Sequence, residues 1–203
     1  DGITKISNAA MEPEIVDLAK FLNKMGAKIE GAGTNIIKIT GVEKLKDVSY
    51  SIMPDRIEAG TLLCAVAITG GKVKLNKVIP EHINQILNKL EQTGCEIKIE
   101  NKCVCLKAPK KIKAVDIKTM PYPGFPTDMQ SVFASILTIA KGNSVIVENI
   151  FENRYKYVSE LKRMGAKITV EGRIAVIKGC KKLSGATVES TDLRGGAALV
   201  VAG

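Results

Sequence analysis

Apolar and polar positions alternate along this chain in a pattern that returns at intervals. Three short alternating runs end at an asparagine, at Asn8, Asn76 and Asn149. Each run is followed by an amphipathic segment that closes on a glycine, at Gly26, Gly94 and Gly165. Helical spacing of the apolar residues and a glycine just past the end predict a helix in each segment. Two more alternating runs follow each glycine and predict β-hairpins over residues 28–39, 96–106 and 167–177.

The first two amphipathic helices present the same apolar face. Its members recur at helical spacing and are Ile15, Leu18, Ala19 and Leu22 in one helix and Ile83, Ile86, Leu87 and Leu90 in the other. A face of this width predicts packing against a core on one side and solvent on the other.

A second kind of helix is apolar nearly all round and begins at an aspartate. The three opening residues are Asp55, Asp128 and Asp192. Asp55 and Glu58 have the spacing of a capping box. Because these segments have no polar face, we expect them to be buried, with the hairpins and amphipathic helices outside. The repeated unit is therefore strand, buried helix, strand, amphipathic helix and two strands, which is an α/β fold built from βαβαββ units.

The chain divides into two complete units with half a unit at each end. The complete units cover residues 50–108 and 115–179, and the halves cover 1–41 and 187–203. Each half exposes an apolar face that it cannot cover alone. We predict that the C-terminal half docks on the N-terminal half to form one permuted domain. The alternative is that residues 1–52 form a separate lobe or pair with another copy of the chain.

Composition disfavours several classes of protein. The net charge is +9, but the lysines are scattered and only four tyrosines and four phenylalanines accompany them, so nucleic-acid binding is disfavoured and small anions are the expected partners. The five cysteines lack C-x-x-C spacing and a nearby histidine, which predicts no metal site and free thiols in a reducing compartment. No apolar stretch is long enough to span a bilayer. We expect a cytoplasmic protein with no membrane partner; oligomeric state cannot be predicted.

The segment at 121–130 is the most unusual stretch of the chain. Its sequence, PYPGFPTDMQ, places three prolines before Asp128. Proline fixes φ and favours extended geometry in the residue before it, so this arm is stiff and delivers a carboxylate to the start of a helix. Asp128 is then either an ordinary N-cap or a functional carboxylate.

Arg154 breaks the repeat. It stands where the other amphipathic helices carry Ile15 and Ile83, beside Phe151 and Glu152. It either reaches solvent or pairs with Glu152, or it binds an anion. The three converging helix N-termini would add to a positive end suited to phosphate.

Five motifs together resemble the enolpyruvyl transferases. They are EPEIVD at 12–17, PDRIE at 54–58, PYPGFPTDMQ at 121–130, FENR at 151–154 and TDLR at 191–194. The resemblance implies a fold with helices inside and sheets outside, and two domains facing each other across a cleft. Residues 1–52 would be the last part of the domain that carries the catalytic loop, and residues 53–203 most of the second domain.

The resemblance also implies a reaction and its substrates. Phosphoenolpyruvate would donate its enolpyruvyl group to the 3-hydroxyl of UDP-N-acetylglucosamine, in the step that opens peptidoglycan synthesis, with no cofactor. Asp128 would be the general base, and the backbone of Ile150 would contact the nucleotide sugar. Further residues expected around the cleft are Arg154, Arg194, Glu152, Asp192, Glu12 and Glu14.

The chain begins with Asp1 rather than Met, and the family's reactive loop, Lys-Asn pair and late phosphate-binding arginine have no match in it. We therefore expect a piece of a longer enzyme that is inactive alone. Three alternatives remain: an enolpyruvyl transferase acting on a shikimate-type acid, a non-enzymatic repeat scaffold or interaction domain, and a nucleic-acid-binding α/β repeat.

Overall fold

The computed structural model describes residues 2–203, and its chain forms two compact units. The first unit ends at Pro54 and also includes Pro121–Pro123. The second is made of Asp55–Met120 and Gly124–Gly203. Leu22 belongs to the first unit and Leu199 to the second, so the prediction of one permuted domain closed by the two half-units is wrong. The chain instead has the separate N-terminal lobe of the alternative.

The first unit is one helix with a three-stranded antiparallel sheet. Its elements are β1 (Ile3–Ser7), α1 (Pro13–Lys24), β2 (Lys28–Glu30) and β3 (Ile36–Thr40), with strand order β1-β3-β2. Pro13 occupies the first turn of α1, where its missing N–H is not needed. The predicted apolar face of α1 is only partly covered, since Ala19 is buried but the side chain of Leu18 is 52% exposed.

The segment after β3 returns along α1 without forming a strand. The Tyr50 hydroxyl donates to Asp17 Oδ1 at 2.8 Å, and the rings of Tyr50 and Phe21 lie 5.2 Å apart. The backbone N–H of Met53 donates to Asp17 Oδ2 at 3.4 Å. The strand expected at the start of the first complete unit is therefore absent, because these residues bond to α1 instead of to a sheet.

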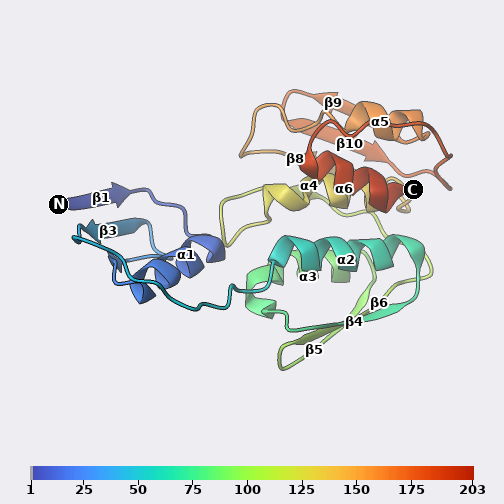
Figure 1. Cartoon of the computed structure of the whole chain (residues 1–203). Helices are drawn as coiled ribbons and strands as arrows, with labels where there is room; N and C mark the ends of the chain where they lie inside the picture. The colour runs from blue at the N-terminus through green and yellow to red at the C-terminus, as the bar shows by residue number, and fades with distance from the viewer. Residues whose placement is uncertain (1) are drawn as a thin grey trace. The chain divides into compact units, whose positions relative to one another are not determined.

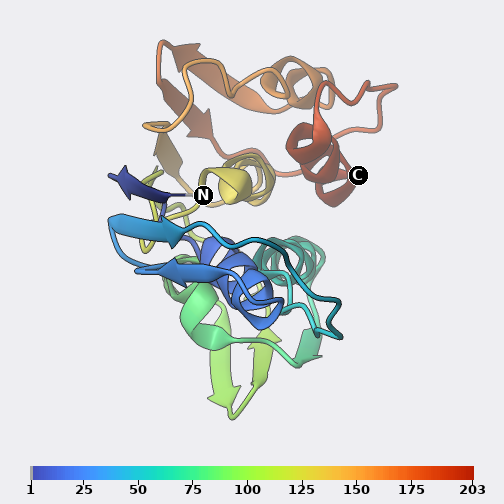
Figure 2. The same ribbon diagram turned by 60° about the vertical axis from the view of Figure 1, so that its left-hand side comes forward.

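In the second unit, three apolar helices lie between two sheets (Figures 1 and 2). The helices, which pack on one another, are α2 (Arg56–Thr69), α4 (Gln130–Leu137) and α6 (Leu193–Ala202). Every residue of α4 is buried, as expected of a helix with no polar face. Gly60 permits the close approach of α2, because a Cβ there would lie 2.9 Å from Met129 Sδ and 3.0 Å from Ile86 Cδ1.

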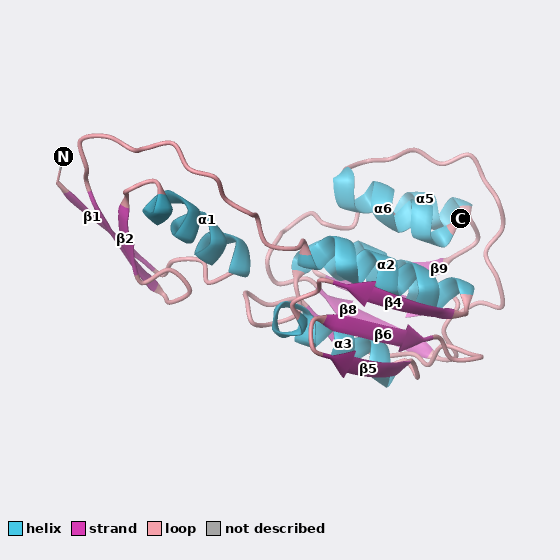
Figure 3. Ribbon diagram, turned by 60° about the horizontal axis from the view of Figure 1, so that its bottom comes forward, coloured by secondary structure: helices cyan, strands magenta, loops and turns pink. Residues whose placement is uncertain are grey.

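The first sheet of this unit has the order β4-β6-β5 and is antiparallel (Figure 3). It is formed by β4 (Lys72–Asn76), β5 (Glu96–Glu100) and β6 (Cys103–Lys107), and the connection from β4 contains the 3₁₀ turn η1 (Pro80–Ile83) and α3 (Asn84–Gln92). The predicted face of this amphipathic segment is confirmed: Ile83, Ile86, Leu87 and Leu90 are all buried.

The second sheet contains one complete βαβαββ unit. Its order is β7-β8-β10-β9, with β7 parallel to β8 and the other pairs antiparallel. Its strands are β7 (Ile117–Lys118), β8 (Asn143–Val147), β9 (Lys167–Glu171) and β10 (Ile174–Lys178), and its connections hold η2 (Thr127–Met129), α4 and α5 (Val158–Arg163). All three predicted hairpins are present, and the glycines at 26, 94 and 165 have the positive φ of helix C-termini.

The cysteines lie in the second unit and are all free thiols. Cys64 and Cys95 are buried in the core, whereas Cys103, Cys105 and Cys180 are partly exposed. Burial raises the pKa of the Cys64 and Cys95 thiols. Among the described residues, no helix combines the length and the apolar character needed to cross a membrane.

Candidate active site

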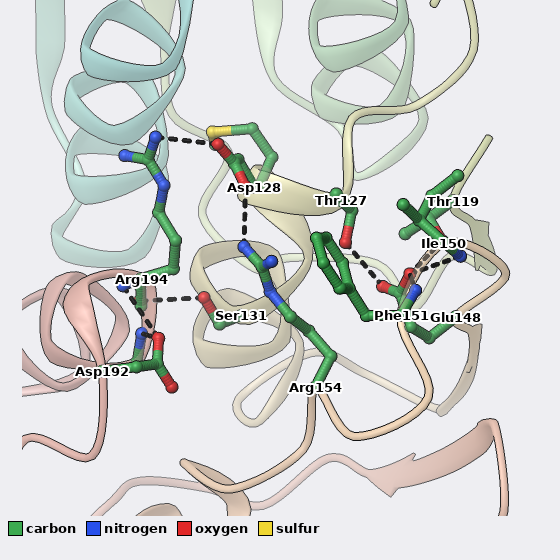
Figure 4. A network of polar contacts seen from close by, with 12 residues as sticks. Thr119, Thr127, Asp128, Ser131, Glu148, Ile150, Phe151, Arg154, Asp192 and Arg194 are labelled. Carbon is green, nitrogen blue, oxygen red and sulfur yellow. Dashed lines mark hydrogen bonds and ion pairs between the residues drawn. The ribbon is translucent and has the colours of Figure 1, made fainter. Parts of the chain in front are cut away.

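Asp128 lies between two guanidinium groups in the second unit (Figure 4). Arg154 Nη2 donates to Asp128 Oδ1 at 2.6 Å, and Arg194 Nη2 donates to Asp128 Oδ2 at 2.8 Å. Each carboxylate oxygen is thus bound by a different arginine. The side chain of Asp128 is 36% exposed, so the cluster is open to a ligand.

Asp128 does not cap α4. It lies within η2, which begins after Pro126, and the N-cap position of α4 is Met129. By contrast, Asp55 Oδ1 accepts from the N–H groups of Ile57 and Glu58 at the start of α2. The expectation that Asp128 opens the helix as a cap is therefore wrong. The Asp128 carboxylate does not cap the helix and faces the two arginines instead.

Arg194 is held by the beginning of α6. Asp192 Oδ1 accepts from the N–H groups of Arg194 and Gly195 and so caps this helix as predicted. The hydroxyl of Ser131 in α4 donates to the carbonyl oxygen of Arg194 at 2.8 Å. These contacts fix the first turn of α6 against the first turn of α4, next to Asp128.

Arg154 bonds to the other carboxylate oxygen of Asp128. It precedes α5, which begins at Val158, so it is not part of the amphipathic helix in which the repeat placed it. Its guanidinium lies 4.7 Å from the centre of the Phe151 ring, a cation–π contact that orients the side chain. The pairing of Arg154 with Glu152 is also wrong, because Glu152 is exposed and lies 3.8 Å from Arg173.

The two arginines control the ionisation of Asp128. Burial acts to raise the pKa of its carboxyl, but Arg194 and then Arg154 outweigh burial by charge and hydrogen bonding. The pKa of Asp128 is therefore below its ordinary value. At neutral pH the carboxylate is fully ionised, and both its oxygens are occupied.

A second carboxylate, Glu148, is fully buried beside this cluster (Figure 4). Its Oε2 accepts from the Thr127 hydroxyl at 2.9 Å. Its Oε1 accepts from the Thr119 hydroxyl at 2.9 Å and from the N–H groups of Ile150 and Phe151 at 2.8 and 3.1 Å. Sequence reasoning missed this residue. The signal was available, since Glu148 continues the alternation of Ser144 and Ile146, which both face inward.

The remaining predicted site residues occupy two places. Ile150 lies in the second unit, with its N–H already bonded to Glu148. Glu12 and Glu14 belong to the first unit, at the beginning of α1. Glu12 Oε1 accepts from the backbone N–H of Tyr122, at the tip of the proline arm, at 3.4 Å. The structure therefore joins Arg154 and Arg194 to Asp128, whereas Ile150, Glu12 and Glu14 lie outside these contacts.

The donor set of this cluster suits an anion rather than a metal ion. Guanidinium groups present planar donors that match carboxylate and phosphate oxygens. Over residues 2–203, no three histidine, cysteine, aspartate or glutamate side chains are grouped so as to hold a metal ion. In such a cluster the two arginines can bind an anionic substrate, and the carboxylate can accept a proton from that substrate once a guanidinium group has released it.

Fold and cluster together define an enolpyruvyl-transferase type of protein. The chain belongs to the EPSP synthase (3-phosphoshikimate 1-carboxyvinyltransferase) family, whose model matches residues 1–203. Among its curated relatives, UDP-N-acetylglucosamine 1-carboxyvinyltransferase 1 of Caldanaerobacter subterraneus subsp. tengcongensis is 58% identical over the whole chain. The UDP-N-acetylglucosamine 1-carboxyvinyltransferases of Trichlorobacter lovleyi and Clostridium botulinum are 57% and 53% identical. The chain spans about half the length of these relatives, 48–49%.

Solved structures show the same fold. The enolpyruvyl transferase NikO from Streptomyces tendae superposes with a TM-score of 0.82 at 24% identity, covering 99% of this chain and 48% of that protein. EPSP synthase from Acinetobacter baumannii gives a TM-score of 0.74 at 21% identity, covering 100% of this chain and 50% of that protein. The predicted arrangement of buried helices and outer sheets is confirmed.

Proposed function

We propose that the protein containing this chain transfers the enolpyruvyl group of phosphoenolpyruvate to the 3-hydroxyl of UDP-N-acetylglucosamine. The observation that carries the proposal is the ionised Asp128 carboxylate held between Arg154 and Arg194. The names of relatives that are 53–58% identical support this acceptor over a shikimate-type acid. The reaction would open peptidoglycan synthesis in the cytoplasm, where free thiols such as those of this chain persist.

The reaction requires both the carboxylate and the guanidinium groups of the cluster. The hydroxyl oxygen of the acceptor bonds to the carbon of phosphoenolpyruvate that carries the phosphate, and the hydroxyl proton passes to a base. The C=C double bond opens in this step, and the methylene carbon takes up a proton to become a methyl group. The methyl carbon then loses a proton as the C–O bond to phosphate breaks, which restores the double bond and gives an enolpyruvyl ether and inorganic phosphate. Asp128 would take the proton, and the arginines would stabilise the anionic groups.

Asp128 needs to lose an arginine before it can act as a base. A carboxylate bound by two guanidiniums has a lowered pKa and accepts a proton poorly. The substrates carry phosphate groups, which compete for guanidinium donors. We infer that substrate phosphate draws Arg154 or Arg194 away, and that the pKa of Asp128 then rises toward the range of a useful base. Binding of the anion would thus activate the carboxylate.

The other site residues keep supporting roles in this proposal. Because the N–H of Ile150 is bonded to Glu148, its backbone would contact the nucleotide sugar through its carbonyl oxygen. Asp192 would act by capping α6 and so fixing Arg194. Exposed Glu152 would contact substrate directly, and Glu12 and Glu14 of the first unit remain predicted substrate-binding residues. Residues 1–52 would belong to the domain that carries the catalytic loop and residues 53–203 to the second domain.

Replacement of the base tests the proposal. In the full-length protein, Asp128→Asn should lower kcat by roughly 10²–10⁴, the usual contribution of a general base, and should change the affinity for UDP-N-acetylglucosamine much less. Phosphate release measures the first quantity and calorimetry the second. Asp47→Asn, an exposed aspartate of the first unit, is the matched control. A kcat near that of the wild type would exclude Asp128 as the base.

The same calorimetry separates the alternative functions. UDP-N-acetylglucosamine, shikimate 3-phosphate and a short RNA should be titrated into the full-length protein in parallel. Binding of the first alone supports the proposal. Preference for shikimate 3-phosphate would assign the protein to the sibling reaction, and binding of RNA or of none of the three would favour a non-enzymatic role.

A further inference from the structure

We propose that Glu148 is a positioning residue that sets the placement of Asp128 relative to Arg154. Its carboxylate joins the two segments that carry these residues, just beyond the end of the β7–β8 ladder and beside the bonds from Asn149 to Thr119. The consequence for turnover rests on the proposed function, whereas the structural role does not.

The first loop is held through two threonines. Thr127 precedes Asp128 directly, and its hydroxyl donates to Glu148 Oε2. Thr119 lies at the base of the proline arm, where it forms an isolated parallel bridge with Phe125, and its hydroxyl donates to Glu148 Oε1. Glu148 therefore fixes both ends of the excursion that delivers Asp128 (Figure 4).

The second loop is held through its backbone. The N–H groups of Ile150 and Phe151 converge on Glu148 Oε1, which turns the chain sharply after β8. Phe151 is thereby placed with its ring against the guanidinium of Arg154. One carboxylate thus determines where Thr127 and Phe151 lie, and these two residues determine where Asp128 and Arg154 meet.

The hydrogen bonds of Glu148 indicate that it acts by positioning the segments around it and not by its charge. Its four hydrogen-bond donors are two hydroxyls and two backbone amides, all of them neutral. A buried carboxylate is stabilised by such a set of donors without a cation. A glutamine can serve the same donors, because its carbonyl oxygen accepts from the amides and a threonine hydroxyl can accept from its NH₂ group. An aspartate keeps the charge but is shorter by one methylene.

Arg194 provides an internal reference. It is placed by Asp192 and Ser131 and shares no bond with Glu148. A substitution that weakens the hydrogen bonds of Glu148 should therefore weaken the Arg154–Asp128 pair and leave the Arg194–Asp128 pair in place. The charged groups that face Asp128 are Arg194 and Arg154, so loss of the Arg154–Asp128 pair should raise the Asp128 pKa part of the way toward its ordinary value.

The test compares Glu148→Asp with Glu148→Gln. In this chain, the Asp128 carboxyl should be titrated by carbon-detected NMR. We expect Glu148→Asp to raise the Asp128 pKa and Glu148→Gln to leave it near that of the wild type. Glu160→Asp, which shortens another buried glutamate of the same unit, is the matched control and should lower the melting temperature without moving the Asp128 pKa. An unmoved pKa in Glu148→Asp would show that Glu148 only stabilises the core.

Kinetics of the full-length protein give the second readout. Glu148→Asp should reduce kcat about tenfold, because a small misplacement of a catalytic group has an effect of this order or more, and Glu148→Gln should stay within about twofold of the wild type. The reverse order would overturn the proposal in favour of a role for the charge. If the wild-type protein shows no transferase activity, the proposed function fails, while the NMR titration still decides the role of Glu148.

Discussion

The ion pairs of Asp128 make the stability of the second unit dependent on pH. Because the folded pKa of Asp128 lies below the unfolded value of about 3.9, the pairs contribute their full stabilisation above that value. The contribution is lost as the pH falls through the folded pKa. The carboxylate is partly exposed, so solvent weakens this contribution.

Thermal melts of this chain and of Asp128→Asn should show that dependence. We expect the melting temperature of the wild type to exceed that of the variant by a constant amount from pH 7 to about 5, and the difference to shrink below about pH 4. Asp47→Asn shows whether an amide substitution alone produces this pattern. A difference that persists unchanged to about pH 2 would mean that ionisation of Asp128 does not contribute.

Single residues of the cluster were predictable to different degrees. The proline arm identified Asp128, the broken repeat identified Arg154, and motif resemblance supplied Arg194. The two ion pairs that join them were not predictable, because Asp128 in η2, Arg154 before α5 and Arg194 in α6 lie on separate segments that only tertiary packing brings together. Glu148 was missed because an ionisable residue at a strand end is ordinarily exposed.

At the scale of secondary structure, local chemistry sets where the buried helices begin. Asp55 and Asp192 cap α2 and α6 through their side chains, whereas α4 continues from the turn η2. A side-chain cap satisfies backbone donors that the helix itself leaves unpaired. The three aspartates look equivalent in the sequence and differ in the structure, since Pro126 places Asp128 within a 3₁₀ turn.

Removal of one side-chain cap should lower the free energy of unfolding by a predictable amount. Asp55→Ala should lower the free energy of unfolding of this chain by about 1 kcal/mol, and Asp55→Asn, which keeps an acceptor, should lower it much less. Urea denaturation followed by circular dichroism measures both. Equal losses in the two variants would show that the charge near the helix N-terminus matters more than the hydrogen bonds.

Secondary-structure elements were predicted correctly where the periodicity of apolar residues and the residue that bounds the element agreed. The three hairpins combine alternation with a preceding positive-φ glycine, and all are present. The expected strand at the start of the first complete unit failed because Tyr50 and Met53 bond to Asp17 in α1. That competition involves residues more than 30 positions apart, so no local pattern could reveal it.

At the scale of the whole molecule, the chain spans about half the length of the curated relatives that it matches. The matched relatives are about twice as long, and the reactive loop expected from the family resemblance has no counterpart in these residues. We expect the 203-residue chain to release no phosphate from phosphoenolpyruvate and UDP-N-acetylglucosamine. A sensitive phosphate assay, with heat-treated protein as the blank, measures this. Turnover that survives repeated purification would show that these residues suffice.

The division into two units was only partly predictable from the repeat. Counting half-units suggested that the ends would join, whereas Leu22 and Leu199 fall in different units. Apolar residues indicate that a face needs a partner but do not specify which partner. The partially covered Leu18 of α1 and Val200 of α6, whose side chain is 82% exposed, illustrate the same ambiguity.

The cysteine thiols of the second unit are buried to different extents, so their reactivity can report on the unfolding of this unit. Only a thiolate is alkylated, and Cys64 and Cys95 are both enclosed and shifted to a higher pKa. Brief exposure to iodoacetamide should modify Cys103, Cys105 and Cys180 within minutes and leave the other two intact until the core opens. Mass spectrometry of peptides collected over increasing urea would then trace the opening of the unit without any added probe. Early modification of Cys64 in native buffer would reveal local opening around α2.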